Sequence, residues 1–340
     1  MDTTRLGTMA DTALDRTLAG YGSIGFLIRR RWWPADPRPD ALAGKTAVVT
    51  GAKAGLGKAT ACGLARLGAE VRLVVRGRAG GEAACAEIRR AVPGARLTVD
   101  ECDVSLLAEV RDYAAALTGP VDVLIHNAGV MPTERKETAE GNELMFATHV
   151  LGPHLLTALL RPAMTAQGSA RVIWVSSGGM YGQPLRVDDL QYDERPYRPT
   201  TGYARTKRMQ VVLAKLWNDH LEGSGVVVHS AHPGWATTPG LAKSLTKFAV
   251  LARPILRSPD QGADTFVWLA AAEEPGRRAG LFWHDRAVRP EYYLNSTRES
   301  AADRGELWDA CQELAGLPGV VEEADEADPS AEAGDPGAAL

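Results

Sequence analysis

Short apolar runs alternate with longer segments that fit helices through most of this chain of 340 residues. The runs are rich in valine, isoleucine and leucine, which is typical of strands buried on both faces. We predict strands at residues 45–50, 70–75, 96–101, 121–126, 171–175, 225–230 and 281–283. We predict helices at residues 58–67, 79–92, 105–117, 140–164, 203–221, 241–255, 260–272 and 307–315.

This alternation predicts an α/β protein with one doubly wound, mostly parallel sheet and right-handed crossovers. Ligands bind such sheets at the carboxyl ends of the strands. Pro153 is expected to kink or break the long helical segment, because proline has no N–H to donate. Ser105 is expected to cap its helix. The proline-rich segment 180–202 is too long for an idle connection, so we expect it to be functional.

The two ends of the chain lie outside the alternating pattern. We divide the sequence into an N-terminal arm (1–43), the sheet domain (44–318) and an acidic tail (319–340) that is expected to be disordered. In the arm, an apolar patch precedes three arginines and two tryptophans at residues 29–33. Either the arm packs on the domain, or residues 14–33 contact a membrane surface, with arginines on anionic headgroups and tryptophans at the boundary.

Composition excludes several classes of function. Hydrophobic residues make up 45% of the chain and charged residues 24%, as in ordinary soluble proteins. The net charge is −4 and no basic stripe is present, which argues against nucleic-acid binding. The 4 cysteines show no C-x-x-C spacing and the histidines no metal spacing, so we expect no disulfide framework and no metal site. We expect a cytoplasmic protein, either free or peripheral to a membrane.

A glycine-rich turn at residues 51–57 directly follows the first predicted strand and leads into a helix. This order of strand, turn and helix is the context in which such glycines bind a dinucleotide. Glycines let the backbone approach the pyrophosphate, and the helix N-terminus supplies N–H groups and a positive dipole. The residues of the turn that we expect to bind the cofactor are Gly51, Lys53, Gly55, Leu56 and Gly57.

The second strand ends in Val75-Arg76, where many NAD sites have an acidic residue on the ribose hydroxyls. An acid would repel a 2′-phosphate, whereas a guanidinium would bind it through two hydrogen bonds. Lys53 adds a second positive charge nearby. We therefore favour NADP(H) over NAD(H) as the cofactor.

Further polar motifs follow the other strands, and the carboxyl ends of parallel strands share one edge of a sheet. Asp103 follows the third strand, at a position that typically holds adenine. The other motifs at this edge are Asn127-Ala128-Gly129, Ser177 and Pro233-Gly234 with Thr238.

Tyr203 and Lys207 lie one turn apart on the same face of a predicted helix. A free phenol has a pKa of about 10, so it exchanges protons poorly at neutral pH. A nearby cation favours the phenolate and lowers that pKa. The pair is therefore a candidate general acid and base.

Together these motifs resemble the short-chain dehydrogenase/reductase (SDR) family, in whose order they occur over about residues 44–285. The Val75-Arg76 pair and the long segment between Ser177 and Tyr203 are similar to its retinol-dehydrogenase-like branch. Residues 175–180, 189–191, 232–236 and 238–240 resemble one subgroup of that branch. The resemblance implies a Rossmann-type fold with a seven-stranded sheet. It also implies interconversion of an alcohol and a ketone or aldehyde by hydride transfer, for which we expect a lipophilic substrate.

The resemblance also implies roles for individual residues. Tyr203 exchanges the proton with the substrate oxygen, and Lys207 lowers its pKa and binds the nicotinamide ribose. Ser177 holds the substrate oxygen as charge develops on it. Asn127 and the glycines line the cofactor, and Thr238 touches its carboxamide end.

Three questions stay open at this point. His149 stands where many SDR members have an asparagine that relays protons through water; it either carries a proton itself or only packs. The chain is either an enzyme or a redox-sensing module that binds NADP(H) and regulates a partner. Pairing of two copies through the helices around Leu156 and Tyr203 would give a homodimer.

Overall fold

The computed structural model describes residues 11–15, 17–166, 168–237 and 255–318 of the chain. Thr238, the predicted acidic tail and nearly all of the helix predicted at 241–255 lie outside these residues. No helix of the described ranges is long and apolar enough to cross a membrane.

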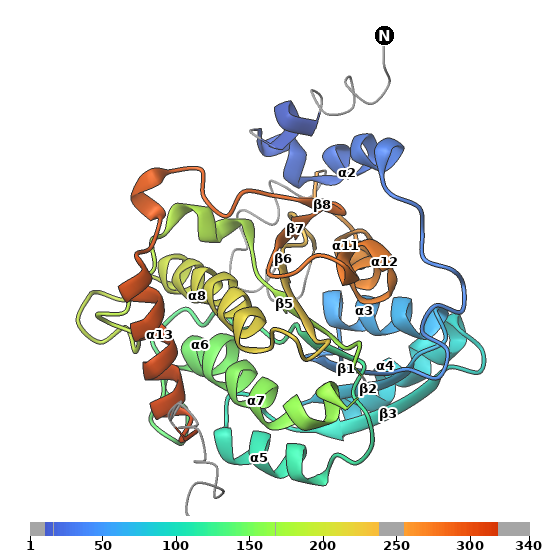
Figure 1. The fold of residues 1–340 in the computed structure, drawn as a ribbon, viewed down its shortest axis with the longest axis horizontal. Coiled ribbons are helices and arrows are strands. Elements are labelled where there is room, and N and C mark those ends of the chain that lie inside the picture. The colour runs from blue at the N-terminus through green and yellow to red at the C-terminus, as the bar shows by residue number, and fades with distance from the viewer. Residues whose placement is uncertain (1–10, 16, 167, 238–254, 319–340) are drawn as a thin grey trace, which may run out of the picture.

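The centre of the molecule is one sheet with the strand order β3-β2-β1-β4-β5-β6-β7-β8 (Figure 1). All neighbouring strands are parallel except β7 and β8, which form an antiparallel hairpin. The strands are β1 (Thr46–Thr50), β2 (Glu70–Val75), β3 (Arg96–Glu101), β4 (Val123–His126), β5 (Arg171–Val175), β6 (Val227–Ala231), β7 (Phe282–His284) and β8 (Ala287–Val288). The predicted α/β doubly wound fold is confirmed, with β8 as an additional edge strand.

Helices cover both faces of the sheet (Figure 1). The helices of the domain are α3 (Gly55–Arg66), α4 (Arg78–Ala91), α5 (Leu107–Ala116), α6 (Leu144–Phe146), α7 (Gly152–Thr165), α8 (Pro199–His220), α11 (Pro259–Ala271), α12 (Glu273–Gly276) and α13 (Ala301–Leu314). Successive residues of a strand point to opposite faces, so Val48 lies in the core cluster that contains Leu155 of α7 and Leu213 of α8, whereas Val49 lies in the cluster that contains Leu64 of α3. Both faces are therefore buried, as the apolar strands require.

The long helical segment differs from its prediction in one respect. Pro153 does not break it, because the chain passes from α6 through a π-helical segment, Ala147–Leu151, directly into α7. Pro153 lies in the first turn of α7, where its missing N–H is tolerated. A π segment inside a helix often marks a functional site.

Ser105 does not cap α5, contrary to prediction. Its backbone N–H and its hydroxyl both donate to Asp103 Oδ1, at 3.0 and 2.7 Å. The carboxylate of Glu140, distant in sequence, instead accepts from the N–H groups of Leu107 and Ala108 at 2.7 and 2.9 Å.

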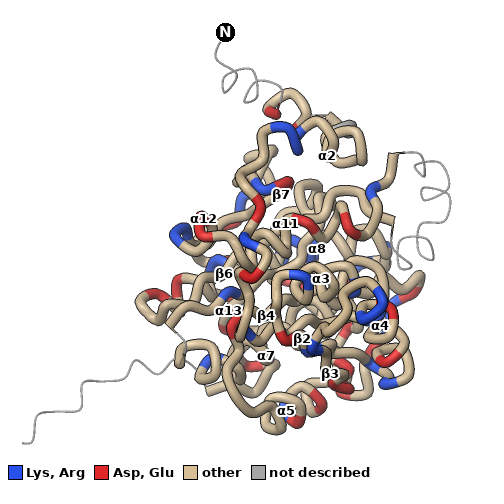
Figure 2. Tube along the Cα trace, turned by 90° about the vertical axis from the view of Figure 1, so that its right-hand side faces the viewer, with Lys and Arg blue, Asp and Glu red and all other residues tan. Residues whose placement is uncertain are grey.

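The described part of the arm packs on the domain beside β7 and β8 (Figure 1). It contains α2 (Ser23–Arg29) between two 3₁₀ turns, Leu18–Tyr21 and Arg30–Trp32. Arg29 is buried and its guanidinium contacts Asp285 at 3.0 Å. Acidic and basic positions are interspersed over the domain, with basic positions next to α2 (Figure 2).

Candidate functional site

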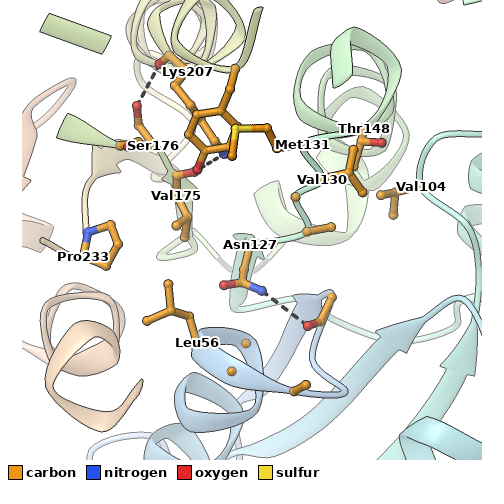
Figure 3. Close-up of a pocket in the computed structure, with 18 of the residues that line it drawn as sticks. Leu56, Val104, Asn127, Val130, Met131, Thr148, Val175, Ser176, Lys207 and Pro233 are labelled. Carbon is orange, nitrogen blue, oxygen red and sulfur yellow. Dashed lines mark hydrogen bonds between the residues drawn. The ribbon is translucent and has the colours of Figure 1, made fainter. Parts of the chain in front are cut away.

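A cavity of about 600 Å³ lies at the carboxyl edge of the sheet (Figure 3). All predicted site residues that the structure describes line it: Gly51, Lys53, Gly55, Leu56, Gly57, Arg76, Asp103, Asn127, Ala128, Gly129, Ser177, Tyr203, Lys207, Pro233 and Gly234. Thr238 lies outside the described residues. The loops after β1, β2, β3, β4, β5 and β6 thus all reach one cavity, as expected for ligand sites of parallel sheets.

Several lining residues were not predicted as site residues from the sequence. Val104 directly follows Asp103, and Val130 directly follows the Asn127-Ala128-Gly129 motif. Their position in the sequence could therefore have predicted that they line the cavity. Met131 and Thr148 carried no such signal. The other residues that line the cavity without having been predicted as site residues are Ala54, Val74, Val75, Cys102, Val175, Ser176, Gly179, Thr200, Ala204, Trp235 and Ala236.

The glycine turn has the geometry of a cradle for a phosphate. Gly51 has φ +68°, and a Cβ on it would lie 2.8 Å from the Ala128 backbone. A Cβ on Gly57 would lie 2.4 Å from Asn127 Nδ2, closer than real side chains approach. The residue before α3 makes no side-chain cap within the described structure. The helix N-terminus is therefore left for an anionic ligand, which fits a pyrophosphate.

Asn127 fastens the β4 loop to the β1 loop. Its Nδ2 donates to the Thr50 carbonyl at 2.9 Å, and the N–H groups of Asn127 and Ala128 both donate to Thr50 Oγ1 at 3.0 Å. Asn127 points toward the glycine turn across the cavity floor (Figure 3). These bonds hold the two loops at the spacing that the cavity needs.

One end of the cavity carries two cations and one carboxylate. Lys53 and Arg76 both line it, and the Arg76 guanidinium lies 3.9 Å from Asp103 Oδ2. The Arg76 side chain is about half exposed, so it is free to meet a ligand. Arg78 pairs instead with Glu82 and Glu101 and is not part of the lining.

Tyr203, Lys207 and Ser177 meet at the opposite end. The Lys207 ammonium lies 5.4 Å from the centre of the Tyr203 ring, one helical turn away. Ser177 follows β5, and its hydroxyl is near enough to the Tyr203 phenol to lower the pKa of that phenol. Lys207 Nζ donates to the Val175 carbonyl at 2.9 Å, and Ser176 Oγ donates to the Lys207 carbonyl at 2.7 Å (Figure 3). The end of β5 therefore fixes α8 at the residues that face the cavity.

Burial controls the protonation of this group. Desolvation raises the pKa of Tyr203 to about 12, although the neighbouring Ser177 hydroxyl acts to lower it. Desolvation also lowers the pKa of Lys207 to about 7. Each shift disfavours the charged form in a low-dielectric site. The lowering of the phenol pKa that the sequence predicted is thus outweighed by burial in the protein without cofactor.

His149 is fully buried in the π segment and packs edge-on against Tyr203, with ring centres 5.5 Å apart. Its Nε2 accepts from the Val130 N–H at 3.0 Å, so Nδ1 carries the proton and donates to Thr206 Oγ1 at 2.8 Å. Burial and the charge of Lys207 lower the His149 pKa well below its usual value. Both nitrogens have partners in this neutral form, which favours packing over proton transport by the ring.

Large apolar and aromatic side chains near the site divide into two groups. Trp235 lines the cavity, whereas Trp174, Met180 and Tyr181 are buried in the core. Tyr21 from the arm stacks on Trp235 at 5.9 Å. The arm thus supports one wall of the cavity from outside.

Comparison with known proteins identifies the group that shares these features. The model of a family described as short chain dehydrogenase matches residues 45–248. The chain is 38% identical over 304 residues to Dehydrogenase/reductase SDR family member 12 of Bos taurus, covering 88% of this chain and 95% of that protein. It is 33% identical over 326 residues to Retinol dehydrogenase 13 of Homo sapiens, covering 92% and 93%. A crystal structure of a protein from Mycobacterium Paratuberculosis superposes with a TM-score of 0.66 at 29% identity, covering 81% and 94%.

These matches confirm the resemblance that the motifs predicted. They include the retinol-dehydrogenase-like branch and, in the member 12 protein, the subgroup to which the motifs after β5 and β6 point.

Proposed function

This chain belongs to the short-chain dehydrogenase/reductase family, and from that premise we propose that it is an NADP(H)-dependent reductase or dehydrogenase of lipophilic carbonyl or alcohol substrates. Its class is established by the family: it is an oxidoreductase that interconverts alcohols and carbonyls with a nicotinamide cofactor. The cofactor preference, the substrate class and the residue roles are the proposal. The observation that supports it is one cavity with a phosphate cradle at one end and the Ser177, Tyr203 and Lys207 group at the other.

We assign the proton chemistry to three side chains. The phenol of Tyr203 gives a proton to the carbonyl oxygen during reduction and takes it back during oxidation. The Ser177 hydroxyl holds that oxygen while charge develops on it. Lys207, as an ammonium, keeps the site positive and presents an N–H toward the cofactor side of the cavity. The nicotinamide, when bound, supplies or accepts the hydride.

The preference for NADP(H) rests on Lys53 and Arg76. Both cations line the far end of the cavity, beyond the glycine turn where a pyrophosphate fits. A 2′-phosphate there would meet a guanidinium that is half exposed and held only loosely, at 3.9 Å, by Asp103. Charge-assisted bonds of this kind are about twice as strong as neutral ones, so they favour the phosphorylated cofactor.

The proposed lipophilic substrate follows from the walls near Tyr203. Val130, Met131 and Trp235 line the cavity there, and Met131 is flexible enough to adapt to several shapes. Apolar walls with a few polar groups at the reacting end are the usual design of small-molecule sites.

We further propose that the arm places the protein on anionic membranes, where such substrates dissolve. Ile24 and Leu27 lie three residues apart on α2 and are 52% and 56% exposed, and Trp32 is 43% exposed. Arg30 and Arg31 beside them are exposed as well. Apolar side chains with adjacent arginines suit the boundary between headgroups and acyl chains. The protein would then be cytoplasmic and membrane-peripheral.

The experiment that tests the enzyme assignment is NADPH oxidation with a panel of medium-chain aldehydes and ketones. Tyr203→Phe is expected to lower the rate by about 10²–10⁴-fold, the usual contribution of general acid catalysis, while NADPH still binds. The matched control is Tyr197→Phe, whose hydroxyl donates to the Pro132 carbonyl outside the cavity lining. Equal rates for wild type and Tyr203→Phe would refute the role of the phenol.

The alternative is a redox-sensing module that binds NADP(H) without turnover. NADPH binding by the wild type with no oxidation on any member of the panel would favour it. The complete Ser177, Tyr203 and Lys207 group supports the enzyme, because a sensor does not require it.

A further inference from the structure

The Lys207 ammonium has a second protein acceptor behind the cavity. Besides the Val175 carbonyl, Nζ donates to Gln210 Oε1 at 2.9 Å, one turn further along α8. Gln210 is fully buried and Lys207 is 3% exposed. An ammonium has three N–H donors, so these two bonds leave one for the cavity that Lys207 lines.

The amide of Gln210 is itself held by a backbone carbonyl in the neighbouring helix. Its Nε2 donates to the His149 carbonyl at 2.9 Å. In an α-helix that carbonyl would accept from the N–H four residues later, but that residue is Pro153, which has none. His149 lies in the π-helical segment Ala147–Leu151, where the regular donor is five residues later, and Gln210 Nε2 is a side-chain donor to its carbonyl.

These contacts form a chain from one helix to the catalytic group on another. The His149 carbonyl fixes Gln210, Gln210 fixes Lys207, and Lys207 lies beside Tyr203. Among the described residues, two titratable side chains face Lys207: Tyr203 on its own helix and His149 on the π segment. From β5, Lys207 meets only the Val175 carbonyl and the nearby serine hydroxyls. Neither of those two side chains carries a negative charge at neutral pH, so neither stabilises the buried ammonium as a counter-ion.

We propose that Gln210 is a positioning residue for catalysis: anchored on the His149 carbonyl of the π segment, it holds the Lys207 side chain in place beside Tyr203 and favours its charged form. This inference rests on the proposed function, because it gives Gln210 its role through Lys207. A lysine side chain has four rotatable bonds, and two fixed acceptors restrict it to one position. The amide oxygen of Gln210 gives the Lys207 ammonium an acceptor in a place where no charged side chain provides one.

The test uses the cofactor-free protein with lysines labelled with carbon-13 at Cε, followed by NMR from pH 5 to 11. The Lys207 signal is identified by its loss in Lys207→Met. Gln210→Met removes the acceptor, and we expect Lys207 to titrate about one pH unit lower than in the wild type, since a hydrogen bond to a charged group is worth about that much. Gln210→Glu supplies a carboxylate, and we expect Lys207 to titrate at higher pH.

The matched control is Gln312→Met on α13. The side-chain amide of Gln312 forms a hydrogen bond with His154, and neither residue lines the cavity. It should leave the Lys207 titration unchanged while removing a comparable hydrogen bond. An unchanged titration in folded Gln210→Glu would overturn the proposal, even if Gln210→Met fails to fold. A lower melting temperature for the Gln210 variants with an unchanged Lys207 titration would show a merely structural role and overturn it as well.

Activity then separates this proposal from the assignment of function. If the wild type reduces a carbonyl, the pH at which kcat/KM for NADPH falls should move with the Lys207 titration in both Gln210 variants. If it reduces none, the enzyme assignment fails, and the NMR titration still decides whether Gln210 controls Lys207.

Discussion

Lys207 couples the burial of the site to its chemistry. Desolvation lowers the pKa of the Lys207 ammonium to about 7 and raises the pKa of the neighbouring Tyr203 phenol to about 12. At neutral pH the phenol is therefore protonated and the ammonium half titrated. This combination suits carbonyl reduction, which needs a proton donor and a positive site.

The first prediction concerns pH. kcat/KM for NADPH in carbonyl reduction, which reports groups of the free enzyme, should be constant below about pH 6 and fall about tenfold per unit well above pH 7, as Lys207 loses its proton. Tyr203 stays protonated over this range, so its titration should not lower kcat/KM at the acid end of the profile. A rate that is constant up to pH 9 would contradict the role of the ammonium.

The second prediction concerns the cofactor. Arg76→Asp should weaken NADPH use and improve NADH use, because a carboxylate repels a 2′-phosphate and accepts from ribose hydroxyls. The ratio of kcat/KM for the two cofactors should change by about 10–100-fold, the effect of one or two charge-assisted bonds. Arg78→Asp is the control, since Arg78 pairs with Glu82 and Glu101 and lies outside the cavity lining. An unchanged ratio in Arg76→Asp would refute the NADP(H) preference.

At the scale of elements, the hairpin between β7 and β8 joins the arm to the domain. Its two-residue turn places Asp285 and Arg286 at φ +53° and +54°, a region that costs non-glycine residues about 1–3 kcal/mol. Ion pairs offset this cost. Asp285 contacts Arg257 at 2.6 Å and Arg29 of the arm at 3.0 Å, and Arg286 contacts Asp264 at 2.7 Å.

The third prediction tests this buried cluster. Burial would raise the pKa of Asp285, but the charges and hydrogen bonds of Arg257 and Arg29 lower it below its usual value. Asp285→Asn keeps a residue that tolerates positive φ but leaves the arginines without this anion, so we expect a loss of about 3–5 kcal/mol in unfolding free energy at pH 7. Urea unfolding measures it.

The control for the cluster is Glu273→Gln, which removes the exposed partner of Arg277 and should cost at most about 0.5 kcal/mol. The pH dependence has a definite sign. A carboxyl whose folded pKa is lowered stabilises the protein above its unfolded pKa of about 3.9, and that contribution is lost as pH falls through the folded value. The difference between wild type and Asp285→Asn should therefore shrink below about pH 4; a difference that is constant down to pH 3 would argue against ionisation of Asp285.

At the scale of the whole molecule, the arm lies beyond the layers of sheet and helices while its base is fixed by the buried cluster (Figure 1). It exposes Ile24, Leu27 and Trp32 on the outside and stacks Tyr21 on the cavity wall through Trp235. A membrane contact would thus lie on the same part of the molecule as the cavity wall that contains Trp235. The homodimer through α7 and α8 stays a prediction; Trp308 of α13 packs on Trp217 of α8 and covers part of that surface.

The fourth prediction tests the membrane contact. Vesicles that contain anionic lipid should float the wild-type protein, and Ile24→Ser with Leu27→Ser should reduce the floated fraction several-fold, because each buried side chain contributes about 1.5–3 kcal/mol. The matched control replaces two other exposed leucines, Leu294 and Leu314, with serine. Equal flotation of the two double variants would sink the proposal.

Much of the fold could be predicted because its signals are local. The strands β2, β3 and β5 have the bounds that the apolar runs predicted, and the glycine turn follows β1 as expected. The strand β8 was missed because two residues carry no periodicity. The predicted cap of α5 was wrong because Glu140, which is distant in the sequence, accepts from the first N–H groups of the helix in place of the local Ser105.

Periodicity and motif spacing are properties of neighbouring residues, so the amino-acid sequence alone was enough to predict the class of fold, the family and the residue types at the cavity. The protonation and hydrogen bonding of those residues depend instead on how the helices pack. The tertiary structure sets the pKa directions of Tyr203 and Lys207, which depend on how much water the packed helices exclude, and it joins Gln210 to the His149 carbonyl across 61 residues. Contacts of that range follow from packing, which no local pattern specifies.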